Sequence, residues 1–270
     1  MPFPLSRAAG EGRGEGNLVE AFRQFALTLP SPASGRGEKP STMPRMDTPQ
    51  TAFLFDLDGT LVDSVYQHVL AWQEALESEG IPLSVWRIHR KIGMSGGLMT
   101  NILLRESGHE IDAARGERLR RMHAESYNRR SKAIRPLPGA RALVAHLTEA
   151  RIPWAIATSG RMETARPVLE TLGVDFERVP IVTRDEVRYA KPDPDLFIAA
   201  AKKLCVAIET STVVGDSVWD MLAARRARAL GIGLLSGGYA SEELERAGAY
   251  RVFEDPADML RHIDEIGGRR

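Results

Sequence analysis

The sequence predicts an α/β fold: a doubly wound, Rossmann-like parallel sheet with an inserted all-helical segment. From residue 52 onward, short runs rich in β-branched and aromatic residues alternate with longer segments of helical periodicity. This alternation is typical of a parallel sheet covered by helices on both faces. Between residues 64 and about 135 it stops, and only helix-like segments are present. Several predicted strands also end in Asp or Thr, at the edge where such sheets bind ligands.

The first 46 residues differ from the rest of the chain. Gly, Pro, Ser and Arg dominate residues 1–46, and we expect a disordered tail because this composition buries too little apolar surface to offset its conformational entropy. The stretch LTLPSPASGRGE resembles translated intergenic repeat found ahead of bacterial reading frames, so Met43 or Met46 is a natural start. A genuine flexible tail is the alternative interpretation.

The core elements are predicted in the following order. AFLFD is the first strand, and a helix over residues 65–81 follows it, with Asp63 or Ser64 at the N-cap position. Later strands are predicted at residues 154–158, 179–183, 212–216, 231–235 and 249–253. Helices are predicted between most of them, at residues 161–173, 193–204, 217–231 and 241–248.

This order divides the chain into an α/β core and an insertion. We expect residues 47–63 and 136–270 to form the core, and residues 64–135 to form a helical insertion after the first strand. Within the insertion, GGLMTNILLRESG and DAARGERLRRMHAESYNRRSKAI are the clearest helical segments. The Pro and Gly residues of PLPGA mark the return to the core.

Composition excludes several classes of partner. The chain has 36 basic and 36 acidic side chains, so no basic excess indicates binding to nucleic acid or to a membrane surface. No apolar run approaches the ~18–20 residues that a membrane span requires. The single cysteine, Cys205, cannot form an intrachain disulfide, which favours a reducing, cytoplasmic location. We expect its side chain to be buried in the core and not to act as a nucleophile.

Acidic and hydroxyl side chains end three of the predicted strands. Asp56 and Asp58 follow the first strand, Thr158 ends the strand at 154–158, and Asp216 ends the strand at 212–216. Each has a simpler alternative, since an Asp after a strand is often a helix cap and Thr158-Ser159-Gly160 resembles a turn. Together they would converge on one crevice, where carboxylates repel one another unless a cation is present. Mg²⁺ suits oxygen ligands of this kind.

A lysine completes a set suited to phosphate chemistry. Lys191, in YAKPDPDLF, precedes a predicted helix and adds a positive charge. Carboxylates, a metal, a lysine and a hydroxyl are the groups that phosphoryl transfer needs, because its transition state spreads negative charge over the equatorial oxygens. A carboxylate can itself act as the nucleophile through an aspartyl-phosphate.

These motifs resemble the haloacid dehalogenase-like (HAD) superfamily, in the branch with phosphoglycolate phosphatase and β-phosphoglucomutase. The first family motif, DxDGTLxDS, is present from Asp56 to Ser64. The second is Thr158 in ATSG, and the third is Lys191 in AKPDPDLF. The fourth is VGDSVWD, which contains Asp216 and Asp220. All four occur in family order across roughly residues 52–255.

The resemblance implies roles for the residues of the first three motifs. Asp56 would be the nucleophile and a Mg²⁺ ligand. Asp58 would be the general acid and then the general base, and its backbone carbonyl would bind the metal. Thr158 and Lys191 would hold the phosphoryl oxygens. Because Asp58 is present, cleavage of a carbon–halogen or carbon–phosphorus bond is disfavoured, since the members that cleave such bonds lack this residue.

It also implies supporting roles around the metal. Asp216 would be a further carboxylate ligand of Mg²⁺, and Asp220, one helical turn later, would steady the metal shell or Lys191. Gly59 would permit the tight turn that brings backbone amides to the phosphate, and Thr60 would orient that turn.

By the same resemblance, residues 64–135 would form a mobile helical cap that closes over the site. His68 matches a histidine of the mutase and, with Ser159, Arg90 and Lys91, is a candidate substrate contact, although packing or a solvated charged face explains these residues equally well. Gly96 stands where the mutase has an arginine for a second phosphate, which weakens the mutase interpretation. Trp72 and Trp86 are expected in the core of the cap.

The sequence therefore predicts a Mg²⁺-dependent phosphatase of a small phosphorylated metabolite, such as phosphoglycolate or a sugar phosphate, acting through an aspartyl-phosphate. A β-phosphoglucomutase-like mutase is one alternative, and a non-catalytic binding protein on the same scaffold is another. The sequence leaves the true substrate open, as well as the choice between monomer and homodimer.

Overall fold

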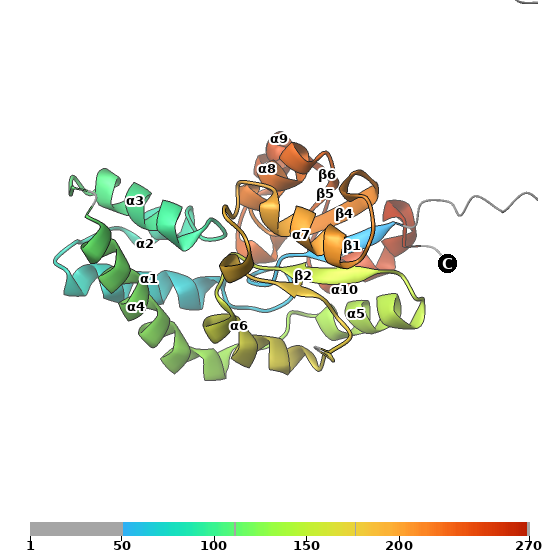
Figure 1. The fold of residues 1–270 in the computed structure, drawn as a ribbon, viewed down its shortest axis with the longest axis horizontal. Coiled ribbons are helices and arrows are strands. Elements are labelled where there is room, and N and C mark those ends of the chain that lie inside the picture. Colours follow the sequence, from blue (N-terminus) through green and yellow to red (C-terminus); the bar gives the residue numbers. More distant parts are fainter. Residues whose placement is uncertain (1–50, 111, 176, 269–270) are drawn as a thin grey trace, which may run out of the picture. The chain divides into compact units, whose positions relative to one another are not determined.

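The computed structural model describes residues 51–110, 112–175 and 177–268 (Figure 1). The described residues belong to one compact unit. The predicted tail, residues 1–46, lies outside the described residues.

A parallel sheet of six strands forms the centre of the core. The strand order is β3-β2-β1-β4-β5-β6, and every neighbouring pair is parallel. The predicted doubly wound sheet is confirmed, and each predicted strand is present. The strands are β1 (Ala52–Phe55), β2 (Trp154–Ala157), β3 (Ile181–Val182), β4 (Ser211–Gly215), β5 (Leu230–Leu234) and β6 (Ala249–Phe253).

Helices cover both faces of this sheet because alternate strand residues point to opposite sides. Phe53 and Phe55 of β1 belong to the apolar cluster that includes Leu143 of α5. Leu54, between them, belongs to the cluster that includes Phe197 of α7. Figure 1 shows α7 and α8 on one face, and α5 and α6 on the other. The bounds are α5 (Ala140–Glu149), α6 (Met162–Leu169), α7 (Asp195–Lys203), α8 (Val218–Ala227), α9 (Ser241–Ala247) and α10 (Pro256–Arg261).

Between residues 65 and 133 the described elements are all helices, as the sequence predicts, and these helices have an apolar cluster of their own. That cluster includes Val69, Trp72, Leu103 and Leu119, all buried. In Figure 1 these helices lie beside the sheet and not on either of its faces. They are α1 (Val65–Ser78), α2 (Val85–His89), α3 (Gly96–Glu106) and α4 (Ala113–Arg130).

Two expectations about single side chains are wrong. Cys205 is exposed, because it follows the last turn of α7 with a left-handed φ of 57° and points away from the core. Trp86 is 62% exposed. It lies on α2, a helix of five residues in which Ile88 is the buried residue.

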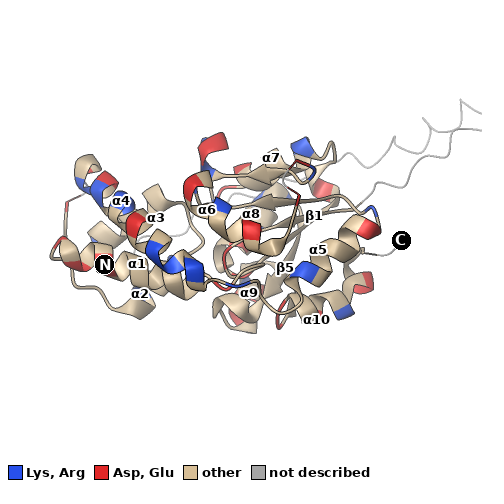
Figure 2. Cartoon of the chain, turned by 90° about the horizontal axis from the view of Figure 1, so that it is seen from below, with Lys and Arg blue, Asp and Glu red and all other residues tan. Residues whose placement is uncertain are grey.

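Charges of both signs are mixed over the surface. In Figure 2, Lys and Arg positions predominate along α4 with a few Asp and Glu positions among them, and both signs also occur on α5 and α10. None of the helices in the described part of the chain is long and apolar enough to cross a membrane.

Candidate active site

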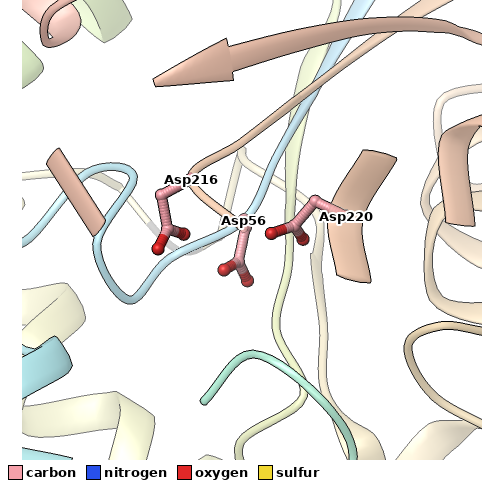
Figure 3. Close-up of side chains that lie close together, drawn as sticks. All are labelled: Asp56, Asp216 and Asp220. Carbon is pink, nitrogen blue, oxygen red and sulfur yellow. The ribbon is translucent and has the colours of Figure 1, made fainter. Parts of the chain in front are cut away.

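The register of two central strands brings the acidic residues together. Phe55 of β1 pairs with Val214 of β4, and the backbone N–H of Asp56 donates to the Val214 carbonyl at 2.9 Å. Asp56 and Asp216 therefore leave the sheet at the same edge. Asp220 reaches this edge from the first turn of α8. Figure 3 shows the three carboxylates directed into one space.

This acidic cluster fits a hard divalent cation. One carboxylate oxygen each from Asp56, Asp216 and Asp220 lies within 4.8 Å of the others, and all three residues are buried. Three carboxylates beside the ammonium of Lys191 leave two formal negative charges when all groups are ionised, which matches one divalent ion. All-oxygen ligands of this charge are those that Mg²⁺ prefers.

Two glycines make room for the carboxylate of Asp216. A Cβ atom at Gly59, whose φ is +81°, would lie 2.5 Å from Asp216 Oδ2, and one at Gly237 would lie 1.8 Å from the same atom. Thr60 Oγ1 donates to Asp216 Oδ1 at 3.1 Å. The turn after β1 and the loop after β5 thus enclose this side chain. Any residue other than glycine at position 59 or 237 would displace it.

Lys191 lies between two of the carboxylates and is fully buried. Its Nζ forms an ion pair with Asp56 and another with Asp220 Oδ1 at 2.8 Å. Asp220 also accepts hydrogen bonds from the Ser217 N–H at 3.1 Å and the Ser217 hydroxyl at 2.5 Å. The buried ammonium of Lys191 depends strongly on such partners, because an isolated buried charge is costly.

Burial and mutual repulsion shift the protonation of the cluster. Burial raises the pKa of Asp56 and of Asp216, and neighbouring carboxylates raise both further. Burial alone would lower the pKa of Lys191, but Asp220 and Asp56 outweigh this effect and raise it. The lysine is therefore charged, and a further cation would favour full ionisation of the carboxylates.

Asp58 faces a different set of partners. Its carboxylate accepts a hydrogen bond from Ser64 Oγ at 2.5 Å, and its Oδ1 lies 3.2 Å from His68 Nε2 and 3.4 Å from the Tyr127 hydroxyl. Burial opposes ionisation, but the charge and hydrogen bond of His68 and the hydroxyl of Ser64 lower the pKa of Asp58 to about 2. Ser64 is the N-cap residue of α1, yet its side chain makes no capping bond, because it is engaged by Asp58.

The second predicted motif ends β2 beside these carboxylates. Thr158 is buried, and its N–H donates to the Val182 carbonyl at 3.0 Å. Thr158 Oγ1 accepts from the Gly160 N–H at 3.0 Å, so the hydroxyl is held in a tight turn. Ser159 Oγ donates to the Gly93 carbonyl at 3.0 Å, which links the sheet edge to the loop between α2 and α3.

A cavity of about 510 Å³ opens in front of the strand ends. Its lining includes Asp56, Asp58, Thr158, Ser159 and His68. The clustered carboxylates Asp216 and Asp220 do not line it, nor does Lys191; they lie behind Asp56.

Two predicted substrate contacts are engaged elsewhere. Arg90 forms an ion pair with Glu243 and lies over the Tyr239 ring at 4.1 Å. Lys91 forms an ion pair with Glu106 at 3.0 Å. Neither residue lines the cavity, because both side chains point toward surface carboxylates.

The structure also adds residues that the sequence motifs do not indicate. His123 and Tyr127, four residues apart on α4, reach the cavity wall and Asp58 respectively. An H-x-x-x-Y pair on one helical face was the available pattern, but such pairs are common in ordinary packing. Gly237, in LSGGY, had no distinguishing feature apart from its glycine neighbour.

Comparison with known proteins places the chain in a family. The model of the family described as haloacid dehalogenase-like hydrolase matches residues 50–228. Hexitol phosphatase A of Escherichia coli is 38% identical over 61% of this chain and 74% of its own length. The phosphoglycolate phosphatase of Rhodospirillum rubrum is 30% identical over 77% of this chain and 88% of its own. The crystal structure of a hydrolase from Pseudomonas syringae is 58% identical, with a TM-score of 0.79, over 80% of this chain and 99% of that one.

Proposed function

The chain belongs to the haloacid dehalogenase-like hydrolases, and from this premise we propose that it is a Mg²⁺-dependent phosphatase acting through a phosphorylated Asp56. The predicted superfamily and the prediction of an enzyme of this hydrolase type are confirmed. The metal, the intermediate and the substrate are the content of the proposal.

One observation carries the assignment of the nucleophile. Among the three clustered carboxylates, Asp56 lines the cavity whereas Asp216 and Asp220 lie behind it. A nucleophile must face the substrate, while residues that hold a metal or a lysine act from behind. Asp56 faces the cavity, and its ion pair with Lys191 holds its carboxylate in place from behind.

The residues around Asp56 suit the first half-reaction. Its carboxylate oxygen would attack phosphorus, and the ester oxygen of the substrate would leave with a proton from Asp58. The hydroxyl of Thr158, which lines the cavity, would bind a phosphoryl oxygen, and Lys191 behind Asp56 would offset the negative charge of the phosphoryl group. The carboxylates of Asp56 and Asp216, with the backbone carbonyl of Asp58, would hold Mg²⁺, which supplies positive charge beside the phosphoryl group when bound.

Asp58 would serve both half-reactions. The negative charge of a bound phosphoryl group favours the protonated form of a neighbouring carboxyl, and the imidazolium form of His68, whose Nε2 lies 3.2 Å from Asp58 Oδ1, would supply that proton. After the leaving group departs, the ionised Asp58 would take a proton from water. That water would attack phosphorus, release phosphate and restore the Asp56 carboxylate.

We propose a phosphorylated polyol or sugar as the substrate. The cavity of about 510 Å³ falls within the usual range for small-molecule sites, roughly 300–1,000 Å³, and leaves room for more than a two-carbon acid. Its wall mixes imidazole, carboxylate and guanidinium groups from His123, Glu163 and Arg184, which suits hydroxyl groups. The relative named hexitol phosphatase A supports the same class.

Residues 64–135 would act as a cap over this cavity, since His68 and His123 line it from α1 and α4. Gly96 also lines it, and it offers no side chain that could hold a second phosphate, which favours hydrolysis over mutase chemistry. We expect a cytoplasmic protein, consistent with the single cysteine.

The test is a screen of phosphorylated hexitols, hexoses and glycolate with the full chain, in Mg²⁺ and in a chelator. We expect release of inorganic phosphate from a polyol or sugar phosphate in Mg²⁺ alone. Asp56→Asn should abolish it, and Asp175→Asn, which changes an exposed aspartate outside the cavity, should not. Formation of a 6-phosphate from a hexose 1-phosphate without free phosphate would instead indicate a mutase. Turnover by Asp56→Asn would contradict the nucleophile.

A further inference from the structure

Two histidines from different helices of the insertion are hydrogen-bonded to each other. His68 Nδ1 of α1 lies 3.0 Å from His123 Nε2 of α4. The pair is enclosed by aromatic rings: His68 stacks on Tyr127 with centroids 3.9 Å apart, and His123 stacks on Trp72 at 4.4 Å. Both histidines line the cavity.

This pair continues to the carboxylate proposed as the general acid. His68 Nε2, on the other side of the ring, lies 3.2 Å from Asp58 Oδ1. An ionised carboxylate only accepts hydrogen bonds, so His68 Nε2 must carry the hydrogen. The remaining nitrogen, Nδ1, then faces His123.

The hydrogen bond between the two rings can form in either charge state of His68. A neutral His68 accepts at Nδ1 from the His123 N–H, and a protonated His68 donates to a neutral His123. Burial, followed by the charge of His68, lowers the pKa of His123 well below its usual value, so His123 stays neutral and can take either part. Its orientation is fixed by the stack on Trp72.

We propose that His123 is a positioning residue for proton transfer: it holds the His68 ring, and through it the Asp58 carboxylate, in the orientation that serves the leaving group. This inference rests on the proposed function. Without His123, Nδ1 of His68 loses its partner and the ring can rotate within its stack on Tyr127. The loss would affect the transfer of a proton to the leaving oxygen and not the attack by Asp56.

Leaving groups of different acidity separate this role from packing. p-Nitrophenolate departs without a proton, whereas the alkoxide of a hexitol phosphate needs one. For both esters, kcat/KM reports the steps up to phosphorylation of Asp56. The ratio of the two values does not depend on the fraction of folded enzyme, because both substrates meet the same active molecules.

The experiment measures this ratio in Mg²⁺ for the full-length wild-type protein, His123→Leu, His123→Gln and His109→Leu. Gln keeps a polar nitrogen near the position of Nε2. His109 follows α3, and its Nδ1 contacts Ser107 and not Asp58, so it is the matched control. We expect His123→Leu to lower the alkyl-to-aryl ratio by at least about tenfold, a modest part of the 10²–10⁴ that positioned proton transfer contributes. His123→Gln should recover most of it, and His109→Leu should leave it unchanged.

Equal losses on both esters, or no loss on either, would overturn the positioning role and leave the proposed phosphatase standing. Hydrolysis of neither ester by the wild-type protein would overturn the proposed function, and the positioning role with it.

Discussion

The two walls of the cavity are built in different ways. On the sheet side, Asp56, Asp216, Asp220 and Lys191 are buried, and their positions follow from strand register and from turns. On the helical side, His68 and His123 come from two helices and are held by ring stacking and one shared hydrogen. Backbone geometry fixes the first wall, whereas side-chain packing fixes the second. Changes to the first should therefore alter activity and stability together, and changes to the second should alter the reaction more selectively.

The largest effect is expected on the sheet side, from Lys191→Met. Removing the ammonium leaves Asp56 and Asp220 facing each other without a counter-charge, and breaking a buried pair costs about 3–5 kcal/mol. Phosphatase activity should fall at least about 10³-fold, since an electrostatic stabiliser of the phosphoryl group is lost. Urea denaturation and steady-state kinetics measure both losses.

Lys203→Met is the matched control, because Lys203 pairs with Glu186 at the surface, where both side chains are about 40% exposed. Its loss should cost less than about 1 kcal/mol and leave kcat unchanged. Similar stability losses for the two lysines would contradict the description of the sheet wall as a buried ionic network.

The next effect concerns pH and metal. The folded pKa values of Asp56 and Asp216 lie above the 3.8 of an ordinary aspartate. In metal-free protein these groups bind more protons when folded than when unfolded, so stability falls as the pH rises from about 4 through the folded values. Asp216→Asn should make this decline smaller and raise stability at pH 7 in a chelator, because the neutral amide carries no charge for burial to penalise.

In Mg²⁺ the wild-type protein should become more stable than Asp216→Asn, because a ligand that binds only the folded state stabilises it. The wild-type protein should gain more in thermal midpoint than Asp216→Asn. Greater stability of the wild-type protein in the chelator at pH 7, or equal gains in Mg²⁺, would contradict a cation site at this cluster.

A smaller effect is expected from Tyr127→Phe on the helical side. The change removes a hydroxyl 3.4 Å from Asp58 Oδ1 and keeps the ring under His68. We expect kcat to fall about two- to tenfold, with unfolding free energy changed by roughly 1 kcal/mol, the size of one hydrogen bond. A loss as large as that of Lys191→Met would show that the two walls do not differ as described.

The smallest effect is expected from Arg90→Ala. Arg90 pairs with Glu243 outside the cavity, and both side chains are about one-third exposed. Stability should change by less than about 1 kcal/mol, and KM for the substrate should stay within about twofold. A tenfold rise in KM would instead show that Arg90 contacts the substrate, as the sequence suggested.

The same contrast explains what the sequence could predict. Asp56, Asp216 and Thr158 end strands, and parallel strands bring their carboxyl ends to one edge, so the sheet wall followed from local patterns. Lys191 was recognised by its motif, although its ion pair with Asp220 depends on the packing of α8. Gly237 and its contact with Asp216 come from a loop distant in sequence, and no local pattern indicates that approach.

Less of the helical side could be predicted, because the positions of its side chains depend on how helices pack. The helices themselves followed from periodicity, but their exposed and buried charges did not. Arg90 and Lys91 pair with surface carboxylates, whereas His123 turns inward from a helix rich in arginine. Helix α5 also lies outside the predicted set, since it begins directly after the Pro and Gly residues of 136–139, which read as a turn.

Trapping the covalent intermediate tests the central claim most directly. The full-length protein would be mixed in Mg²⁺ with a phosphomonoester that it hydrolyses. The reaction would be quenched in acid within the first turnover, and the protein would be digested for mass spectrometry. We predict that the peptide containing Asp56 gains the mass of one phosphoryl group, with the label on Asp56 and absent from Asp56→Asn. A label on another residue, or turnover with no phosphorylated peptide at any quench time, would contradict the account.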